Sequence, residues 1–445
     1  MASDLLSIGR SGTRAASAAL NVTAQNITNA SSEGYVRRSI RLAEVSASGG
    51  VGTIGDISLS GVRVSGVVRN ADLFRQSEVR RTGADLARAD AELSGLENIE
   101  ASLEQTGVYD SVVEFEATLQ QLLSDPSNTS LRAAVMEGAR TMSETFNVAS
   151  GSLDSVGQGL RFEASDGVDQ VNLLASELGR INLRLTRAAD ASSDQSTLLD
   201  QRDSLLQKMS EYVDISATIN SDNTADVRIG GTTGPQLVSG GTSGTMAMTT
   251  AADGTIGFTL NSAAIAPASG SLAGQSQALT KLAEVRTRLD TIATSVIDAV
   301  NTAQASGVDL DGNVGQPLFS GTGAGDMAMI QSDGRKLATA PAGAGANSRD
   351  PANLVALRQG LATANPATGL DDLLFDVSSA VSGRTITRNA LDSIASNAII
   401  ALQSQAGVDL DEEAVNLVRF QQAFQASGRV MQVANDIFDT LLGIN

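Results

Sequence analysis

The 445-residue sequence contains no cysteine, no histidine and no tryptophan. Without cysteine and histidine the chain has no thiolate nucleophile, no imidazole base and no ordinary zinc or iron ligand set. The missing cysteines also exclude disulfides, so the sequence does not indicate an oxidising compartment. We therefore expect no cofactor and no metal centre, and only carboxylate chemistry remains open to an enzyme of this composition.

Basic residues and long apolar runs are scarce as well. Lys and Arg number 31 against 50 Asp and Glu, which gives a net charge of −19 that repels nucleic acid and anionic membranes. No stretch approaches the roughly twenty apolar residues of a membrane span. Asp4, Arg10 and Arg14 interrupt any signal-peptide core. The composition indicates either a cytosolic protein or one secreted without a cleaved signal.

Both ends of the chain carry apolar or small residues at alternating spacings of three and four. At the start these are Leu5, Ile8, Gly12, Ala15, Ala19, Val22 and Asn26. At the end they are Leu417, Phe420, Phe424, Ser427, Met431, Ala434, Phe438 and Leu441. This spacing puts each set on one stripe of an α-helix, as in a coiled-coil seam. The pattern alone fits ordinary bundle edges equally well.

The two ends also differ in charge. Residues 1–41 contain five arginines and two acidic residues, whereas residues 406–445 contain six acidic residues and two arginines. Opposite charges favour association and help to set orientation, although salt screens part of the effect. We therefore expect the two terminal helices to meet each other or to meet neighbouring copies.

Between the ends, helical periodicity alternates with segments rich in Gly, Ser and Thr. The sequence predicts helices over 3–28, 73–103, 111–122, 130–156, 166–189, 195–212, 275–305, 371–405 and 409–442. A capping box starts the third of these at Ser111, and a break is expected near Ser382 and Gly383. Strand patterns cover Tyr35 to Val68 and the block 213–271.

We expect a mainly α fold with β insertions, arranged as nested domains. Residues 1–33 and 406–445 would form a terminal coiled-coil domain. Residues 34–212 and 272–405 would form a mainly helical core domain with some β structure. Residues 213–271 would form a small inserted β domain.

Two acidic clusters could carry chemistry. Residues 307–313, GVDLDGN, space their carboxylates as calcium loops do, but Phe319 and Ser320 stand where an EF-hand needs its closing Glu, so a turn is favoured. Near the last helix, the acids Asp409, Asp411, Glu412 and Glu413 could be paired catalytic carboxylates. A helix cap at Asp409, with acids in the first turn that complement the helix dipole, explains them more simply.

Several segments resemble the axial proteins of the bacterial flagellum. Residues 18–35, AALNVTAQNITNASSEGY, resemble the N-terminal helix and Asn-rich turn of rod, hook and hook-associated proteins, and GVRVSGVVRNADLF at 61–74 resembles their following strand. LLDQRDSLLQKMSEYVDI at 198–215 and GVDLDEEAVNLVRFQQAFQASGRVMQVANDIFDTLLGI at 407–444 are similar to runs typical of the FlgK family. Rod and hook proteins usually lack the FQQAF-type run, which points to FlgK.

The resemblance implies a secreted, non-enzymatic structural subunit at the junction between hook and filament. It implies these partners: copies of itself in a helical layer, hook protein on one side, the second hook–filament junction protein on the other, and a cytosolic export chaperone on the C-terminal helix. Export would follow the flagellar type III pathway. The assembly interface would consist of Leu5, Ile8, Gly12, Ala15, Ala19, Val22, Leu417, Phe420, Phe424, Met431, Ala434, Phe438 and Leu441.

Three alternatives stay open at this point. Within the same axial family the chain could be a rod or hook subunit. From another class it could be a carboxylate-dependent glycan hydrolase secreted with the flagellum, which would need two acids about 5–10 Å apart in a cleft. A cytosolic helical scaffold is the third.

Overall fold

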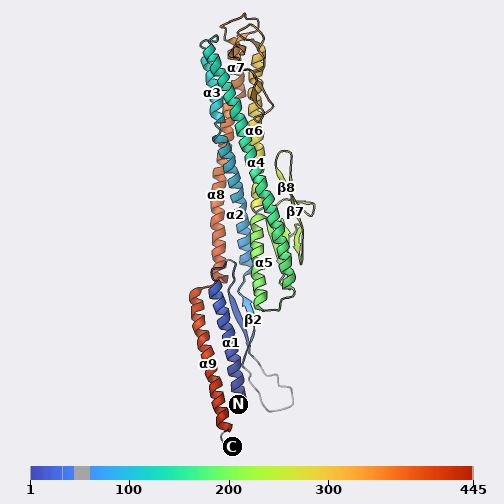
Figure 1. Ribbon diagram of the computed structural model, residues 1–445, viewed down its shortest axis with the longest axis vertical. Coiled ribbons are helices and arrows are strands. Elements are labelled where there is room, and N and C mark those ends of the chain that lie inside the picture. Colours follow the sequence, from blue (N-terminus) through green and yellow to red (C-terminus); the bar gives the residue numbers. More distant parts are fainter. Residues whose placement is uncertain (1, 33, 45–60, 443–445) are drawn as a thin grey trace. The chain divides into compact units, whose positions relative to one another are not determined.

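The computed structural model describes residues 2–32, 34–44 and 61–442, with side chains placed between residues 5 and 440 of these ranges. The described chain is mainly helical (Figure 1). Contacts divide it into two compact units, each built from separate stretches of sequence. Unit 1 contains Met1–Ala84, Gln170–Met246 and Asp392–Asn445, and unit 2 contains Asp85–Asp169 and Ala247–Leu391.

Unit 1 combines long helices with two antiparallel sheets. Its own elements are α1 (Ala2–Asn29), β1 (Arg38–Glu44), β2 (Val62–Arg69), α5 (Ser193–Tyr212), β3 (Ile215–Ile219), β4 (Ala225–Ile229), β5 (Gln236–Ser239), β6 (Thr242–Ser243) and α9 (Leu410–Leu442). It also holds the start of α2 (Leu73–Glu104) and the ends of α4 (Thr129–Leu185) and α8 (Pro366–Ala406). β1 pairs with β2, and the second sheet has the order β3-β4-β5-β6.

Unit 2 is a helical bundle with short strands. Its own elements are α3 (Val108–Leu122), β8 (Ile256–Leu260), β9 (Ala263–Ile265), α6 (Ser271–Ser306), β10 (Gly307–Val308), β11 (Phe319–Ser320), β12 (Ala328–Met329), the 3-10 turn Gly334–Lys336, β13 (Ala340–Pro341) and α7 (Ala352–Ala364). The remaining parts of α2, α4 and α8 run alongside these helices (Figure 1). β7 (Met246–Thr250) pairs with β8, and β8 pairs with β9.

Small residues and ion pairs hold the helices of unit 2 together. A Cβ on Gly95 would lie 2.5 Å from the Cβ of Ala278, so α2 and α6 are in close contact there. On α8, Arg388 Nε donates to Asp90 Oδ1 of α2 at 2.7 Å. Fully buried aliphatic and aromatic side chains fill the bundle, with Phe115 packed edge-on against Phe319.

The Gly-rich stretch after α6, which the sequence did not assign, is ordered by buried polar side chains. Arg132 is fully buried and donates to the carbonyl oxygens of Pro126, Gly334 and Leu337, and it also hydrogen-bonds Thr339. Burial lowers the pKa of Arg132 to about 10. In this stretch, side-chain hydrogen bonds of this kind satisfy backbone carbonyl groups that a regular sheet would otherwise pair.

Three predicted helix boundaries are wrong. The helices expected over 130–156 and 166–189 are one helix, α4, because Gly157 lies against Leu282 in the bundle and is a packing site rather than a break. α8 likewise continues through Ser382 and Gly383. α3 begins at Val108 after Gly107 in a left-handed conformation, and the Ser111 hydroxyl donates to the Val108 carbonyl instead of capping the helix.

The mainly α fold with β insertions is confirmed, as are the terminal helices and the strands within 213–271. Within 35–68, β1 and β2 occupy the ends, and residues 45–60 lie outside the described residues. The contact-based units divide the block 213–271 between them, so the expected three-domain division stays a prediction. Within the described ranges, no helix combines the length and apolar character needed to cross a bilayer.

Candidate assembly surface

The terminal helices α1 and α9 lie side by side in unit 1 (Figure 1). They run antiparallel, because Gly9 and Gly12 near the start of α1 lie against Met431 and Ser427 in the second half of α9. A Cβ on Gly9 would be 2.6 Å from Met431 Cγ, and one on Gly12 would be 2.6 Å from Ser427 Oγ. The pair is therefore close because both helices present small residues at this crossing.

The predicted interface residues divide into two groups. Ala15, Ala19 and Val22 of α1 are buried, as is Ala434 of α9, which is only 1% exposed. Four further residues of the predicted interface are partly buried: Gly12, Leu417, Phe420 and Met431. Small side chains dominate the buried part of this group.

Four larger apolar residues of the predicted interface are exposed to solvent. Phe424 is 41% exposed and Phe438 is 53% exposed, and Leu5 and Ile8 are also exposed. In a single chain these four side chains are therefore largely uncovered, whereas Gly9 and Gly12 of α1 lie against Met431 and Ser427 of α9. The side chain of Leu441 lies outside the described residues.

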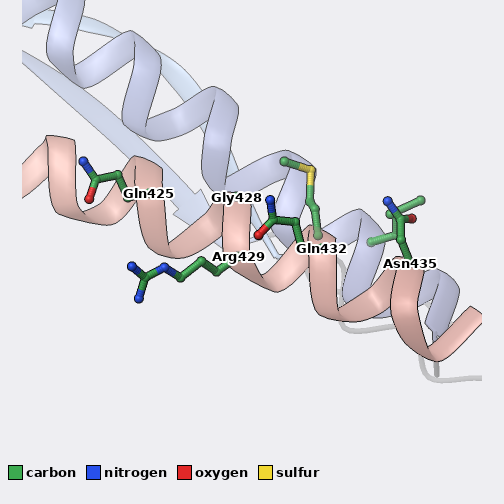
Figure 2. A pocket seen from close by; sticks show the side chains of 7 residues that line it. Gln425, Gly428, Arg429, Gln432 and Asn435 are labelled. Carbon is green, nitrogen blue, oxygen red and sulfur yellow. The ribbon is translucent and has the colours of Figure 1, made fainter.

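A shallow groove of about 630 Å³ follows the contact between α1 and α9. Figure 2 shows Gln425, Arg429, Gln432 and Asn435 projecting from one stretch of α9, with Gly428 between them. This surface mixes amide, cationic and small groups next to the exposed aromatic residues. Contacts between proteins also combine apolar, amide and arginine side chains.

The acidic start of α9 is capped and charge-paired. Asp409 Oδ1 accepts hydrogen bonds from the backbone N–H groups of Asp411 and Glu412, so the predicted cap is confirmed. Arg37 donates to Glu413 Oε1 at 2.7 Å through Nε and to Glu412 Oε1 at 2.8 Å through Nη2. Glu412 and Glu413, two acids of the cluster that could carry chemistry, are thereby held by one guanidinium, which also joins the two oppositely charged ends.

Asn26 holds the start of β1 against α1, a role that the heptad pattern did not predict. Its side chain is 1% exposed and makes two bonds to the backbone of Arg38, donating from Nδ2 to the carbonyl and accepting at Oδ1 from the N–H. The Tyr35 hydroxyl donates to the same Oδ1 at 2.9 Å. The Asn-rich motif at 18–35 thus specifies how α1 leads into β1.

The β1–β2 ribbon is anchored to α5 by buried charges. Asp200 accepts from Arg38 at 2.7 Å and lies 2.8 Å from Arg69 Nε, while Asp203 accepts from Arg69 and Arg202 at 2.9 and 2.7 Å. Burial alone would raise the pKa of Asp203, but Arg202 and Arg69 hold it below its ordinary value. The charged residues of the LLDQRD run are therefore structural.

Gly66 lets β2 approach the loop before α5. Its φ is 154°, and a Cβ would lie 2.2 Å from the Cβ of Ala191. The N–H of Val67 donates to the Ala191 carbonyl at 2.9 Å, and the β1–β2 register shifts between Arg41 and Leu42 beside this glycine. No larger residue fits here, which explains the glycine in the GVRVSGVVR motif.

The loop 307–313 is a turn held by its own acids. Asp309 Oδ1 accepts from the N–H groups of Asp311 and Asn313, and Asp311 pairs with Arg335 at 2.5 Å and Lys336 at 3.0 Å. The acids that a calcium loop would use are thus paired with Arg335 and Lys336. Over the residues that the structure describes, no group of three acidic side chains is placed to hold a metal ion.

Comparison with known proteins gives matches along the whole chain. Residues 93–319 match the family "Flagellar hook-associated protein FlgK helical domain". The chain is 26% identical to flagellar hook-associated protein 1 of Bacillus subtilis over 98% of this chain and 97% of that protein. It is 24% identical to the Escherichia coli protein of the same name over 99% and 100% of the two chains.

Among solved structures, the flagellar hook junction protein FlgK from Burkholderia pseudomallei aligns with a TM-score of 0.45 and 22% identity, over 54% of this chain and 46% of that one. Residues 402–444 match the family "Flagellar basal body rod FlgEFG protein C-terminal". The C-terminal segment thus resembles the rod family as well and does not by itself distinguish FlgK, whereas residues 93–319 match the FlgK helical-domain family model. Because that domain covers half of the sequence and the relatives match end to end, the chain belongs to the FlgK family of flagellar hook-associated proteins.

Proposed function

We propose that this structural protein of the hook–filament junction assembles into its layer through the outer faces of α1 and α9. The observation that supports the proposal is the exposure of large apolar residues on these helices, foremost Phe424 and Phe438 of α9. Large side chains at heptad spacing with no cover in a single chain favour burial against other copies. In the unassembled chain, the buried small residues Ala15, Ala19 and Ala434 allow α1 and α9 to pack together.

The partners follow the axial order of a flagellum. Copies of the chain form one layer, hook protein adjoins one side, and the second hook–filament junction protein adjoins the other. The chain reaches this position through the flagellar type III pathway without a cleaved signal peptide. It acts as a structural subunit and not as an enzyme, in keeping with Glu412 and Glu413, which serve an ion pair with Arg37.

Before export, a cytosolic chaperone covers the apolar residues of α9. Helix-in-groove recognition uses side chains at this three-and-four spacing, and Phe424 and Phe438 are accessible for it without unfolding of the rest of the chain. Chaperone release and assembly would then use the same residues in turn.

The test replaces the exposed aromatic residues in a deletion strain. Phe438→Asp and Phe424→Asp should abolish motility and leave hooks without filaments in electron micrographs. Phe162→Asp is the matched control, because Phe162 is a 77% exposed aromatic on α4 in unit 2. Normal filaments with both α9 variants would contradict the proposed assembly surface.

Chaperone binding is tested separately by copurification from the cytosol. The double variant Phe424→Asp with Phe438→Asp should no longer copurify with the chaperone, and the Phe162→Asp protein should do so normally. Circular dichroism of the purified double variant shows whether the helical content is retained. Full retention of the complex by the double variant would remove α9 as the chaperone site.

A further inference from the structure

The opposite charges of the two chain ends are only partly used within a single chain. Over the described residues, Arg37 is the one arginine of residues 1–41 that forms an ion pair with an acid of residues 406–445. Its partners, Glu412 and Glu413, lie in the first turn of α9. The charges farther along α1 and α9 are therefore not neutralised by the pairing of the two helices.

Two arginines on α1 and two aspartates on α9 remain without an opposite charge. Arg10 and Arg14 are exposed and lie one turn apart, so they share one face of α1. Asp436 and Asp439 are likewise exposed and one turn apart near the end of α9. All four belong to unit 1, and within the described part of the chain none of their side chains forms an ion pair or a hydrogen bond.

Within one chain, these arginines and aspartates lie at different levels along the two antiparallel helices. The glycine contacts of α1 fix these levels, and a helix rises about 1.5 Å per residue. Arg10 is about nine residues, or about 14 Å, from the level of Asp439. Arg14 is about eleven residues, or about 17 Å, from the level of Asp436. Because the two offsets agree within one turn, a single shift of a second copy by about 15 Å along the helices would match each arginine with one aspartate.

The proposed assembly contact would also remove water from these charges. Asp439 directly follows Phe438, which is 53% exposed in the single chain. Arg10 lies one turn after Leu6, which is 41% exposed. When another copy covers these apolar side chains, the neighbouring carboxylate and guanidinium also lose solvent. Charges that lose solvent in this way require a partner of opposite sign.

We propose that Arg10 and Arg14 of one copy pair with Asp439 and Asp436 of a second copy that is displaced by about 15 Å along the helices. The inference rests on the proposed function, in which α1 and α9 carry the contacts between copies. The contact joins two different surfaces, so it repeats from copy to copy and can build a helical layer. Exposed ion pairs add little affinity, so these pairs set the register and the orientation of neighbouring copies.

Crosslinking in assembled flagella tests which surfaces meet. The sequence contains no cysteine, so introduced cysteines are the only thiols of the chain. An Arg10→Cys chain and an Asp439→Cys chain are expressed together in the deletion strain, and the flagella are treated with a short bismaleimide. The expected product is a dimer that forms only when both chains are present. Arg187→Cys, at an exposed arginine of unit 1 outside α1 and α9, should give no dimer with Asp439→Cys.

Charge reversal tests whether the pairs are needed for assembly. Arg10→Glu with Arg14→Glu should reduce the number of cells with filaments at least about tenfold, because like charges then meet in every contact. Asp436→Arg with Asp439→Arg should do the same, and the chain with all four substitutions should restore filaments. Arg187→Glu is the control and should assemble normally. If wild-type chains restore no filaments, the proposed function fails. If the wild type and both reversed chains restore filaments equally, only the present inference fails.

Other partners of these charges give different results. A chain that carries both Arg10→Cys and Asp439→Cys should form a ladder of oligomers, and a crosslink confined to single chains would overturn the proposal. Loss of filaments in the arginine variant that reversal of the aspartates does not restore, with no crosslinked dimer, would instead place the arginines against another flagellar protein. Circular dichroism of the purified reversed chains shows whether their helical content is retained, and the cysteine experiment does not depend on charge reversal.

Discussion

Arg37 Nε donates to Glu413 Oε1 at 2.7 Å and so joins the turn after α1 to the first turn of α9. The backbone N–H of Arg37 also donates to the carbonyl of Ala406 at the end of α8. Glu413 is 2% exposed, so the arginine compensates a buried carboxylate. The junction between α8 and α9 is therefore fixed by the same residue that pairs the two ends of the chain.

Arg37→Gln should loosen the start of α9. The substitution leaves Glu413 buried without its cation, which should lower the stability of this region. We expect a loss of about 1–3 kcal/mol, less than for a fully buried pair, because Arg37 is partly exposed to solvent. Hydrogen exchange should show faster exchange in the first turns of α9. Glu412→Gln is the control with a smaller effect, since Glu412 is 57% exposed. Equal effects of the two variants would show that burial of Glu413 does not matter.

Gly9→Ala should weaken the α1–α9 pair. Alanine normally stabilises a helix by about 1 kcal/mol relative to glycine, but here its Cβ would collide with Met431. We expect a net loss of about 1–3 kcal/mol in the protection of α1, measured by hydrogen exchange. Gly428→Ala is the matched control, with nothing within 4 Å of its new Cβ, and should stabilise α9. A gain with both variants would contradict the close approach.

Acid should weaken the attachment of the β1–β2 ribbon to α5 through Asp203. Its pKa is lowered in the folded chain, so its stabilising effect is present above the unfolded pKa and is lost as pH falls through the folded pKa, below about pH 4. Asp203→Asn should cost roughly 3 kcal/mol at pH 7 and flatten the fall in stability towards low pH. Thermal unfolding from pH 7 to pH 3 measures this.

The control for the acid prediction is Glu97→Gln, an exposed acid on α2. It should leave both the stability at pH 7 and the pH dependence as in the wild type. An Asp203→Asn chain with an unchanged pH profile would show that other acids dominate the acid response.

The terminal helices and their pairing could be predicted because heptad spacing and opposite charge act over short stretches of sequence. The contacts that fix them could not. Gly9 approaches Met431, and Asn26 bonds the backbone of Arg38, only because distant segments meet in the folded chain. The outward position of Phe438 also depends on how α1 and α9 rotate against each other, which a repeat of seven leaves open.

In the middle of the chain, glycine and buried polar residues are the reason that local sequence patterns predicted the structure incorrectly or not at all. Gly157 was expected between two helices, yet packing against Leu282 keeps α4 continuous. The stretch after α6 carries little periodicity because its order comes from the buried side chains of Arg132 and Asn353, which bond backbone carbonyls far away in sequence. Hydrogen bonds between residues far apart in the sequence produce no regular spacing of residue types, so they cannot be predicted from the sequence pattern.

Asn182→Ala should detach the sheet β3–β6 from the end of α4. Asn182 is fully buried, donates to the carbonyls of Ala225 and Gly240 at 2.9 and 2.7 Å, and accepts from the Ala225 N–H at 2.9 Å. Loss of these bonds should cost about 2–4 kcal/mol locally. Faster exchange of the Ala225 amide measures it, and Asn220→Ala, which removes one local bond to Thr224, is the milder control.

The same variant also tests whether the contacts between copies lie on the terminal helices or on the β3–β6 sheet. If layer contacts lie on α1 and α9, Asn182→Ala chains should still restore filaments to the deletion strain while their β3–β6 amides exchange quickly. Loss of filaments with α1 and α9 still protected would place a layer contact on the sheet. That outcome would restrict the proposed surface around Phe424 and Phe438 to only part of the assembly interface, because the sheet shares no residue with it.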